Sequence, residues 1–171
     1  MTTVVDVAGG NPKGQGGKTV VLGIGNTLLA DDGVGIHVIN RLQAEGTPED
    51  DIDFVDGGTL SFALAGTIEN ASKLIVVDAA EMEVAAGTVR VYEAEQMDAF
   101  LGSNRKRSVH EVGLLDLMAI AHLAGRLPTR RALIAIQPGQ VDWGEKPSAS
   151  VAQSIPEACV SARGLLQRWR R

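Results

Sequence analysis

TVVLGIGNTLLADDGVGIHVIN, residues 19–40, is the stretch that decides the fold. Its opening apolar run, residues 19–25, is typical of a parallel strand that is buried on both faces. A glycine-punctuated polar turn follows and carries two adjacent acids, Asp31 and Asp32. From Gly33 the apolar residues recur at the spacing of an amphipathic helix. We therefore expect a strand, a functional loop and a helix, with the rest of the chain supplying the sheet and the ligands around that loop.

Further strands and helices alternate along the chain. Four more segments have the composition of strands, at residues 52–56, 73–78, 88–92 and 132–137. The segment 88–92 alternates apolar with polar residues, which is the pattern of a half-exposed edge strand. Helical spacing is found at residues 60–68, 95–101, 111–124 and from about 151 to 169. This order predicts a three-layer αβα sandwich with a mostly parallel five-stranded sheet and one antiparallel edge strand.

Length and composition predict one α/β domain over residues 19–171, after a glycine-rich lead-in at residues 1–18 that we expect to be disordered. The net charge of -5, with both signs interspersed, gives no basic surface for nucleic acid or for an anionic membrane. We see no signal peptide and no run of about eighteen apolar residues, and therefore expect a cytoplasmic protein. The single cysteine, Cys159, lies on the apolar stripe of the last helix and is predicted to be a core residue.

Acidic residues follow the predicted parallel strands at the point where each strand ends. Asp31 and Asp32 follow the first strand, Asp56 ends the second and Asp78 ends the third, while His110 precedes a predicted helix. The carboxyl ends of parallel strands form the ligand crevice of such sheets. Carboxylates with one imidazole suit divalent ions such as nickel or zinc, and three protein ligands leave positions open for a substrate group or water.

Two other interpretations exist for these residues. Asp32 has the position of a helix-capping carboxylate, and Asp78 and His110 have similar structural alternatives, so chemistry alone does not decide between a cap and a metal site. A nucleotide site is less favoured: Gly23-Ile24-Gly25 starts like GxGxxG, but Leu28 stands where the third glycine belongs. The two carboxylates of the turn would also repel a pyrophosphate.

A family resemblance favours the metal site. The segment GIGNTLLADDGVGIHVI resembles the N-terminal signature of the NiFe-hydrogenase maturation endopeptidases, and the likeness spans residues 20 to about 167. It continues, in order, through DGGT at 56–59, LIVVDA at 74–79, HEVGL at 110–114 and IQP at 136–138.

The resemblance implies a five-stranded sheet flanked by helices and a triad of metal ligands. Matched by position, the ligands are Asp32, Asp78 and His110, which are then also the catalytic residues, and Asp31 is a residue that shapes the turn. The implied reaction removes a short C-terminal extension from the hydrogenase large-subunit precursor after nickel insertion. The nickel then belongs to the substrate and marks it for recognition. The same residues also suit a non-catalytic nickel-sensing or metallochaperone module.

Two further segments are candidates for contact with the substrate. The turn after the second strand contains glycines, which let a backbone approach a ligand closely. The loop from residue 138 to 147 contains Val141 and Trp143, apolar residues in a polar setting. The contact candidates at the site itself are Asp31, Asp56, Gly57, Gly58 and Thr59. We expect the protein to act as a monomer.

Overall fold

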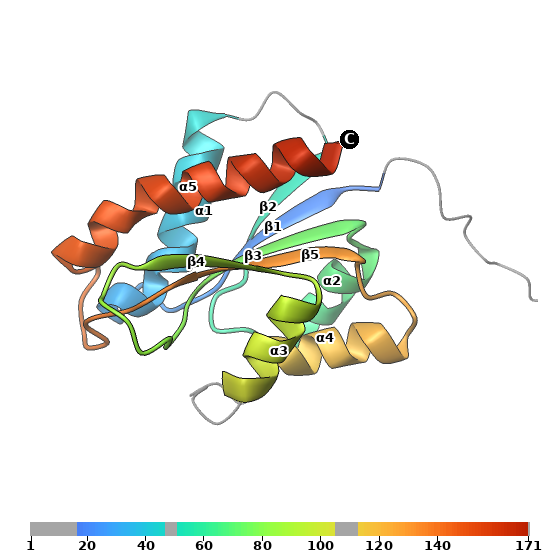
Figure 1. Cartoon of the computed structure of the whole chain (residues 1–171), viewed down its shortest axis with the longest axis horizontal. Helices are drawn as coiled ribbons and strands as arrows, with labels where there is room; N and C mark the ends of the chain where they lie inside the picture. Colours follow the sequence, from blue (N-terminus) through green and yellow to red (C-terminus); the bar gives the residue numbers. More distant parts are fainter. Residues whose placement is uncertain (1–16, 47–50, 105–112, 171) are drawn as a thin grey trace, which may run out of the picture.

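The computed structural model describes residues 17–46, 51–104 and 113–170, and within these residues it forms a five-stranded sheet with helices on both faces (Figure 1). The strand order is β2-β1-β3-β5-β4. Neighbouring strands are parallel except for the pair of β4 with β5. The predicted three-layer αβα sandwich with one antiparallel edge strand is therefore confirmed. The strands are β1 Thr19–Gly23, β2 Ile52–Asp56, β3 Lys73–Ala79, β4 Val89–Glu93 and β5 Arg130–Ile136.

The helices divide between the two faces of the sheet. Helices α1 and α5 share one apolar core, and α2, α3 and α4 share the other. Successive residues of a strand point to opposite faces, so Ile75 of β3 packs in the first core and Val76 in the second. Burial of both faces explains why the strand segments are almost continuously apolar. The helices are α1 Val34–Glu45, α2 Ala65–Asn70, α3 Glu95–Asn104, α4 Leu114–Leu123 and α5 Ala149–Arg170, with short 3-10 helices η1 Ala30–Gly33 and η2 Phe62–Leu64.

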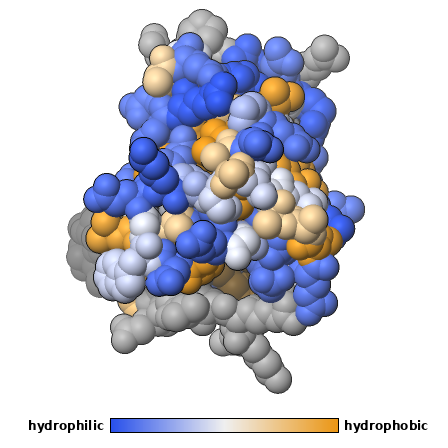
Figure 2. All heavy atoms as spheres, turned by 90° about the vertical axis from the view of Figure 1, so that its left-hand side faces the viewer, coloured by the Kyte–Doolittle hydropathy of each residue, from blue (hydrophilic) through white to orange (hydrophobic). Residues whose placement is uncertain are grey.

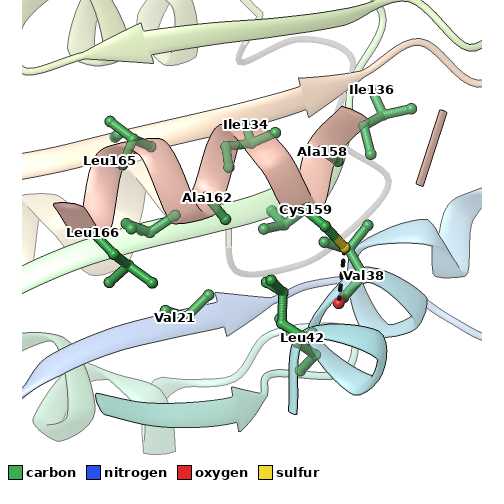
Figure 3. Close-up of a cluster of buried hydrophobic side chains, with 14 of the residues drawn as sticks. Val21, Val38, Leu42, Ile134, Ile136, Ala158, Cys159, Ala162, Leu165 and Leu166 are labelled. Atoms are coloured by element: carbon green, nitrogen blue, oxygen red, sulfur yellow. Dashed lines mark hydrogen bonds between the residues drawn. The ribbon is translucent and has the colours of Figure 1, made fainter. Parts of the chain in front are cut away.

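The predicted core cysteine lies between two helices. Cys159 of α5 is 1% exposed, and its Sγ is 3.9 Å from the carbonyl oxygen of Val38 in α1 (Figure 3). Burial raises the pKa of this thiol. Its prediction as a core residue is confirmed, and no chemistry is assigned to it.

Some boundaries differ from the predicted ones. The first strand ends at Gly23, two residues early, because the backbone turns at Gly25, where φ is 136°. The helix expected at residues 60–68 is instead η2 followed by α2.

Residues 1–16 of the predicted lead-in lie outside the described residues. Lys18 accepts a 3.0 Å hydrogen bond from the amide of Ser72, just before β3. No helix of the described ranges is long and apolar enough to span a membrane.

Two glycines allow the first helix to lie against the ends of the central strands. A Cβ at Gly35 would lie 2.2 Å from the carbonyl oxygen of Val77 in β3. A Cβ at Gly25 would lie 1.8 Å from the carbonyl oxygen of Asp32. Real Cβ atoms do not approach backbone atoms so closely, so only glycine permits this packing. The packing places the acidic turn directly beside β1 and β3.

Gly35→Ala should destabilise the fold by at least about 2 kcal/mol, because the added methyl group meets backbone atoms that cannot move independently. Urea denaturation of both proteins measures this difference. Gly164→Ala in α5 is the matched control, since a Cβ there meets no atom within 4 Å. The control should be neutral or slightly more stable than wild type. Equal stability of Gly35→Ala and wild type would contradict the close approach.

Candidate active site

The two acids expected to bind metal lie at the carboxyl ends of two neighbouring strands. Asp32 is in η1, directly before α1, and Asp78 is the penultimate residue of β3. Gly23, the last residue of β1, pairs with Val77, so Asp78 stands one residue beyond the end of β1. These ends of the strands lie at the left of Figure 1. The sheet topology thus brings both acids to one rim, as predicted.

Asp78 has an unusual electrostatic environment. Burial of its carboxyl group, and then the nearby negative charge of Asp32, raise its pKa from 3.8 to about 8, against a smaller opposing effect of the Ala79 amide. The carboxyl group therefore keeps its proton at neutral pH when no cation is near. A carboxyl group whose ionised form is disfavoured by burial and by a neighbouring carboxylate gains from a positive charge placed beside it. The arrangement fits a divalent cation.

Asp32 does not cap the helix that follows it. Its Oδ2 atom accepts a 2.8 Å hydrogen bond from the amide of Asn26, which lies earlier in the same turn. The N-terminus of α1 receives no hydrogen bond from a capping side chain. Within the described residues, no hydrogen bond occupies the Oδ1 atom of Asp32. The capping alternative is therefore wrong for Asp32, and one of its carboxylate oxygens is available to a ligand.

Asp31 joins two loops that are distant in sequence. Its Oδ2 accepts the amides of Gly139 at 2.8 Å and Gln140 at 2.7 Å and the hydroxyl of Ser148 at 2.8 Å, and its Oδ1 accepts the amide of Ser148 at 2.6 Å. Burial alone would raise the pKa of Asp31, but these hydrogen bonds bring it below its usual value. The side chain is 0% exposed. It has no surface to offer a substrate, so its candidacy as a contact is wrong, and it acts in shaping the turn.

The turn after β2 is attached to the same rim. Gly57 donates its amide to the carbonyl of Gly23 at 2.8 Å, and Gly25 donates to the carbonyl of Gly58 at 2.8 Å. Asp56 stabilises the turn internally, because its Oδ1 accepts the Gly58 amide at 2.8 Å. Asp56 and Thr59 are exposed. The turn is thus held beside the Asp32 loop, and its four residues remain candidates for substrate contact.

Gln137, which belongs to the IQP motif, and Ser148 are structural residues of the site whose roles the sequence did not indicate. Gln137, 4% exposed, accepts the amide of Met82 at 2.7 Å and donates to both carboxylate oxygens of Glu81 at 3.0 Å. It thereby holds the chain that leaves β3 just after Asp78. A buried amide side chain ending an apolar strand was a usable signal for Gln137. Nothing in the local sequence indicated Ser148.

His110, the third predicted ligand, lies outside the described residues. The described chain resumes at Gly113, whose amide donates to Asp116 at the start of α4. Leu114, the first residue of α4, packs in the same core as Val76 of β3, and Asp78 follows Val76 on that face of the strand. Within the described residues, no three His, Cys, Asp or Glu side chains form a group that could hold a metal.

A groove runs beside the edge strand at this end of the sheet. It has a volume of about 590 Å³ between β4 and α3 and is lined by residues that include Arg90, Tyr92 and Phe100. Arg90 pairs with Ala135, which pairs with Asp78. Because adjacent strands are about 4.8 Å apart, the backbone of Arg90 lies about 10 Å from that of Asp78. A peptide that followed β4 would pass close to the acid pair.

Fold and site together define an α/β protein with two acids, Asp32 and Asp78, at the carboxyl ends of its parallel strands. The sequence profile of the hydrogenase maturation proteases matches residues 36–163. Hydrogenase expression/formation protein HoxM of Cupriavidus necator is 34% identical over 151 residues, which cover 88% of this chain and 74% of HoxM. The chain belongs to the hydrogenase maturation protease family.

Solved structures agree with this assignment. The hydrogenase maturating endopeptidase HybD of Escherichia coli superposes with a TM-score of 0.83 at 27% identity, over 88% of this chain and 93% of HybD. The sequence comparison gives a further relative: the hydrogenase 2 maturation protease of Escherichia coli K12 is 29% identical over 126 residues, which cover 73% of this chain and 76% of that protein. The family resemblance identified from the sequence motifs is confirmed.

Proposed function

We propose that this protein is an endopeptidase that removes a short C-terminal extension from the nickel-loaded large-subunit precursor of a NiFe hydrogenase. Asp32, Asp78 and His110 bind the nickel, which the precursor supplies. The enzyme acts as a monomer in the cytoplasm, with the precursor as its protein partner. Membership of a family of maturation proteases supports the reaction class.

The single observation that supports the proposed nickel site is the effect of the charge of Asp32 on the pKa of Asp78. Burial of Asp78, and then the nearby charge of Asp32 in η1, raise the pKa of Asp78 to about 8. A cation bound between the two side chains would favour the ionised form of Asp78. Carboxylate and imidazole donors are suitable ligands for nickel. The site is therefore complete only when the substrate brings its metal.

This arrangement explains how loaded and unloaded precursors would be distinguished. Nickel already held by the precursor gains Asp32, Asp78 and His110 as additional ligands, whereas an unloaded precursor offers nothing for these residues to bind. Bound nickel supplies Lewis-acid chemistry, which polarises a peptide carbonyl or activates water. The chain has no HExxH motif, and its one cysteine is buried in the core. Recognition and cleavage then depend on the same acid pair.

The proposal is tested by incubating the purified protein with nickel-loaded and nickel-free precursor and measuring the precursor mass. We expect loss of the extension from the loaded precursor only. If the loaded precursor binds but keeps its C-terminus, the protein is instead a nickel-sensing or metallochaperone module.

His110→Ala should remain folded but lose cleavage by about a thousandfold or more, as expected when an essential part of a catalytic centre is removed. The initial rate of precursor cleavage measures the effect, and circular dichroism checks the fold. His122→Ala is the matched control, because His122 is exposed on α4 and its loss should leave the rate unchanged. Normal processing by His110→Ala would remove His110 from the triad.

A further inference from the structure

Three exposed apolar side chains lie together beside the acidic turn. Leu28 is 50% exposed, Val141 is 58% exposed and Trp143 is 79% exposed. We call these three residues the Trp143 patch. The face that contains the carboxyl ends of the parallel strands shows apolar areas among polar ones (Figure 2). A tryptophan with most of its surface in water forgoes the favourable free energy of burial, and grouped exposed apolar residues often mark an interaction site.

Backbone hydrogen bonds hold the patch together. Gly144 donates its amide to the carbonyl of Leu28 at 2.9 Å, and Ala30 donates to the carbonyl of Gly144 at 2.7 Å. Leu29 and Gly144 form a parallel bridge. Trp143 also donates its amide to its neighbour Asp142 at 2.7 Å. Leu28 and Trp143 are therefore adjacent on two backbone segments that run side by side.

The segment that contains Leu28 leads directly to the acid pair. Leu28 and Asp32 belong to one turn, in which the Leu28 amide donates to the side chain of Asn26 and the Asn26 amide donates to Asp32. Asp31 attaches this turn to Gly139 and Gln140, which precede Val141. The Trp143 patch is thus continuous, through this turn, with the acid pair.

Other large apolar side chains exposed in the described ranges are placed differently. Phe62 lies in η2, Val91 in β4, Leu123 at the end of α4 and Val160 in α5. Each is on a separate element, and scattered exposure of this kind is ordinary on protein surfaces. They provide matched controls for the patch.

We propose that the Trp143 patch is the docking surface for an apolar segment of the precursor, next to the peptide bond that is cut. This inference rests on the proposed function, because it takes the precursor as the polypeptide that occupies the site. The patch is continuous with the Asp32 turn, so one substrate covers both.

The size of the patch favours a substrate over a second copy of the chain. Three side chains, one of them a tryptophan, bury on the order of 400 Å², whereas a stable interface needs about 800 Å² from each partner. A contact of this size suits a substrate that must leave after cleavage.

Fluorine NMR can observe the contact directly, because the chain has two tryptophans in opposite environments. Trp143 is 79% exposed and Trp169 is 7% exposed. The full-length protein, labelled with 5-fluorotryptophan, is mixed with unlabelled nickel-loaded precursor, and Trp143→Phe assigns the two signals. We expect the Trp143 signal to shift or broaden and the Trp169 signal to stay unchanged.

Cleavage kinetics give a second measurement. Trp143→Ala should raise KM about tenfold or more, with kcat within about twofold of wild type, as expected for a central aromatic contact that is used in binding and not in chemistry. Val160→Ala removes an exposed apolar side chain from α5 and should change neither constant.

The possible results separate the two proposals. A Trp143 signal that stays unchanged while the precursor is cleaved overturns the docking surface and leaves the protease function intact. A signal that responds to the precursor without cleavage supports docking and overturns the protease function. A signal that depends on the concentration of the labelled protein alone identifies a second copy as the occupant and overturns docking of the precursor.

Discussion

An Asp78→Asn protein is expected to be more stable than wild type and unable to process its precursor. Asparagine has the shape of a protonated aspartate, but it cannot ionise. Burial and the charge of Asp32 disfavour the ionised form of Asp78, whose pKa is about 8. The substitution therefore removes an unfavourable charge from the free enzyme and, at the same time, a proposed ligand of nickel.

The sign of the pH dependence follows from the raised pKa. Between the unfolded value of 3.8 and the folded value of about 8, the folded protein binds a proton that the unfolded chain does not. The contribution of Asp78 to stability is thus complete below about pH 4 and is lost as the pH rises through 8. Asp78→Asn removes this loss, so its stability should change less with pH over that window.

The stability gain of Asp78→Asn at pH 8 should be on the order of 5 kcal/mol, and the two proteins should be similar near pH 4. Urea denaturation at several pH values measures this difference. Asp51→Asn, a change at an exposed acid before β2, is the control and should have no such effect. Cleavage of nickel-loaded precursor should fall by about a thousandfold or more in Asp78→Asn.

A direct titration identifies the cause. Carbon-13 NMR of the Asp78 carboxyl group should show a lower pKa in Asp32→Asn than in wild type, because the charge of Asp32 is one of the two effects that raise it. An unchanged pKa would mean that the two acids are not coupled, and it would remove the main support for a shared cation site. Normal cleavage by Asp78→Asn would exclude Asp78 from the reaction.

The strands were predictable because burial on both faces leaves a strong local signal. Segment 52–56 matches β2 at both ends, and the alternating pattern of 88–92 identified the edge strand to within one residue. The start of α1 was harder to predict from the sequence. The sequence suggested a helix beginning at Gly33, but both acids lie in a preceding 3-10 turn, whose form depends on contacts with a distant loop.

The candidate site required more than local patterns. From residue chemistry alone, Asp32 could have been a helix cap. The structure excludes that role, because the carboxylate of Asp32 accepts the amide of Asn26 and no side chain caps α1. The roles of Asp31 and Gln137 depend on partners 108–117 and 55–56 residues away, respectively. Such pairs leave no periodic signal in a single sequence. Asp78 appeared in the sequence as an acid at a strand end, and only its three-dimensional surroundings explain its raised pKa.

Asp31→Ala is expected to destabilise the fold by about 3–5 kcal/mol. The substitution removes a buried carboxylate that accepts hydrogen bonds from the amides of Gly139, Gln140 and Ser148, and each hydrogen bond to a charged group contributes about 1.5–3 kcal/mol. Urea denaturation at neutral pH measures the loss. Ser148→Ala is the matched control, because it removes only one hydroxyl bond and should cost about 1 kcal/mol.

The pH dependence of this loss has the opposite sign to that of Asp78. The pKa of Asp31 is lowered in the folded protein, so its stabilising contribution is present above the unfolded value of 3.8 and is lost as the pH falls through the folded value. The difference between wild type and Asp31→Ala should therefore shrink in acid. A difference below about 1 kcal/mol at neutral pH would show that the loops hold without Asp31. If the predicted loss is observed, Asp31 is the residue that keeps the acidic turn and the Trp143 patch in one rigid unit, although it touches no substrate itself.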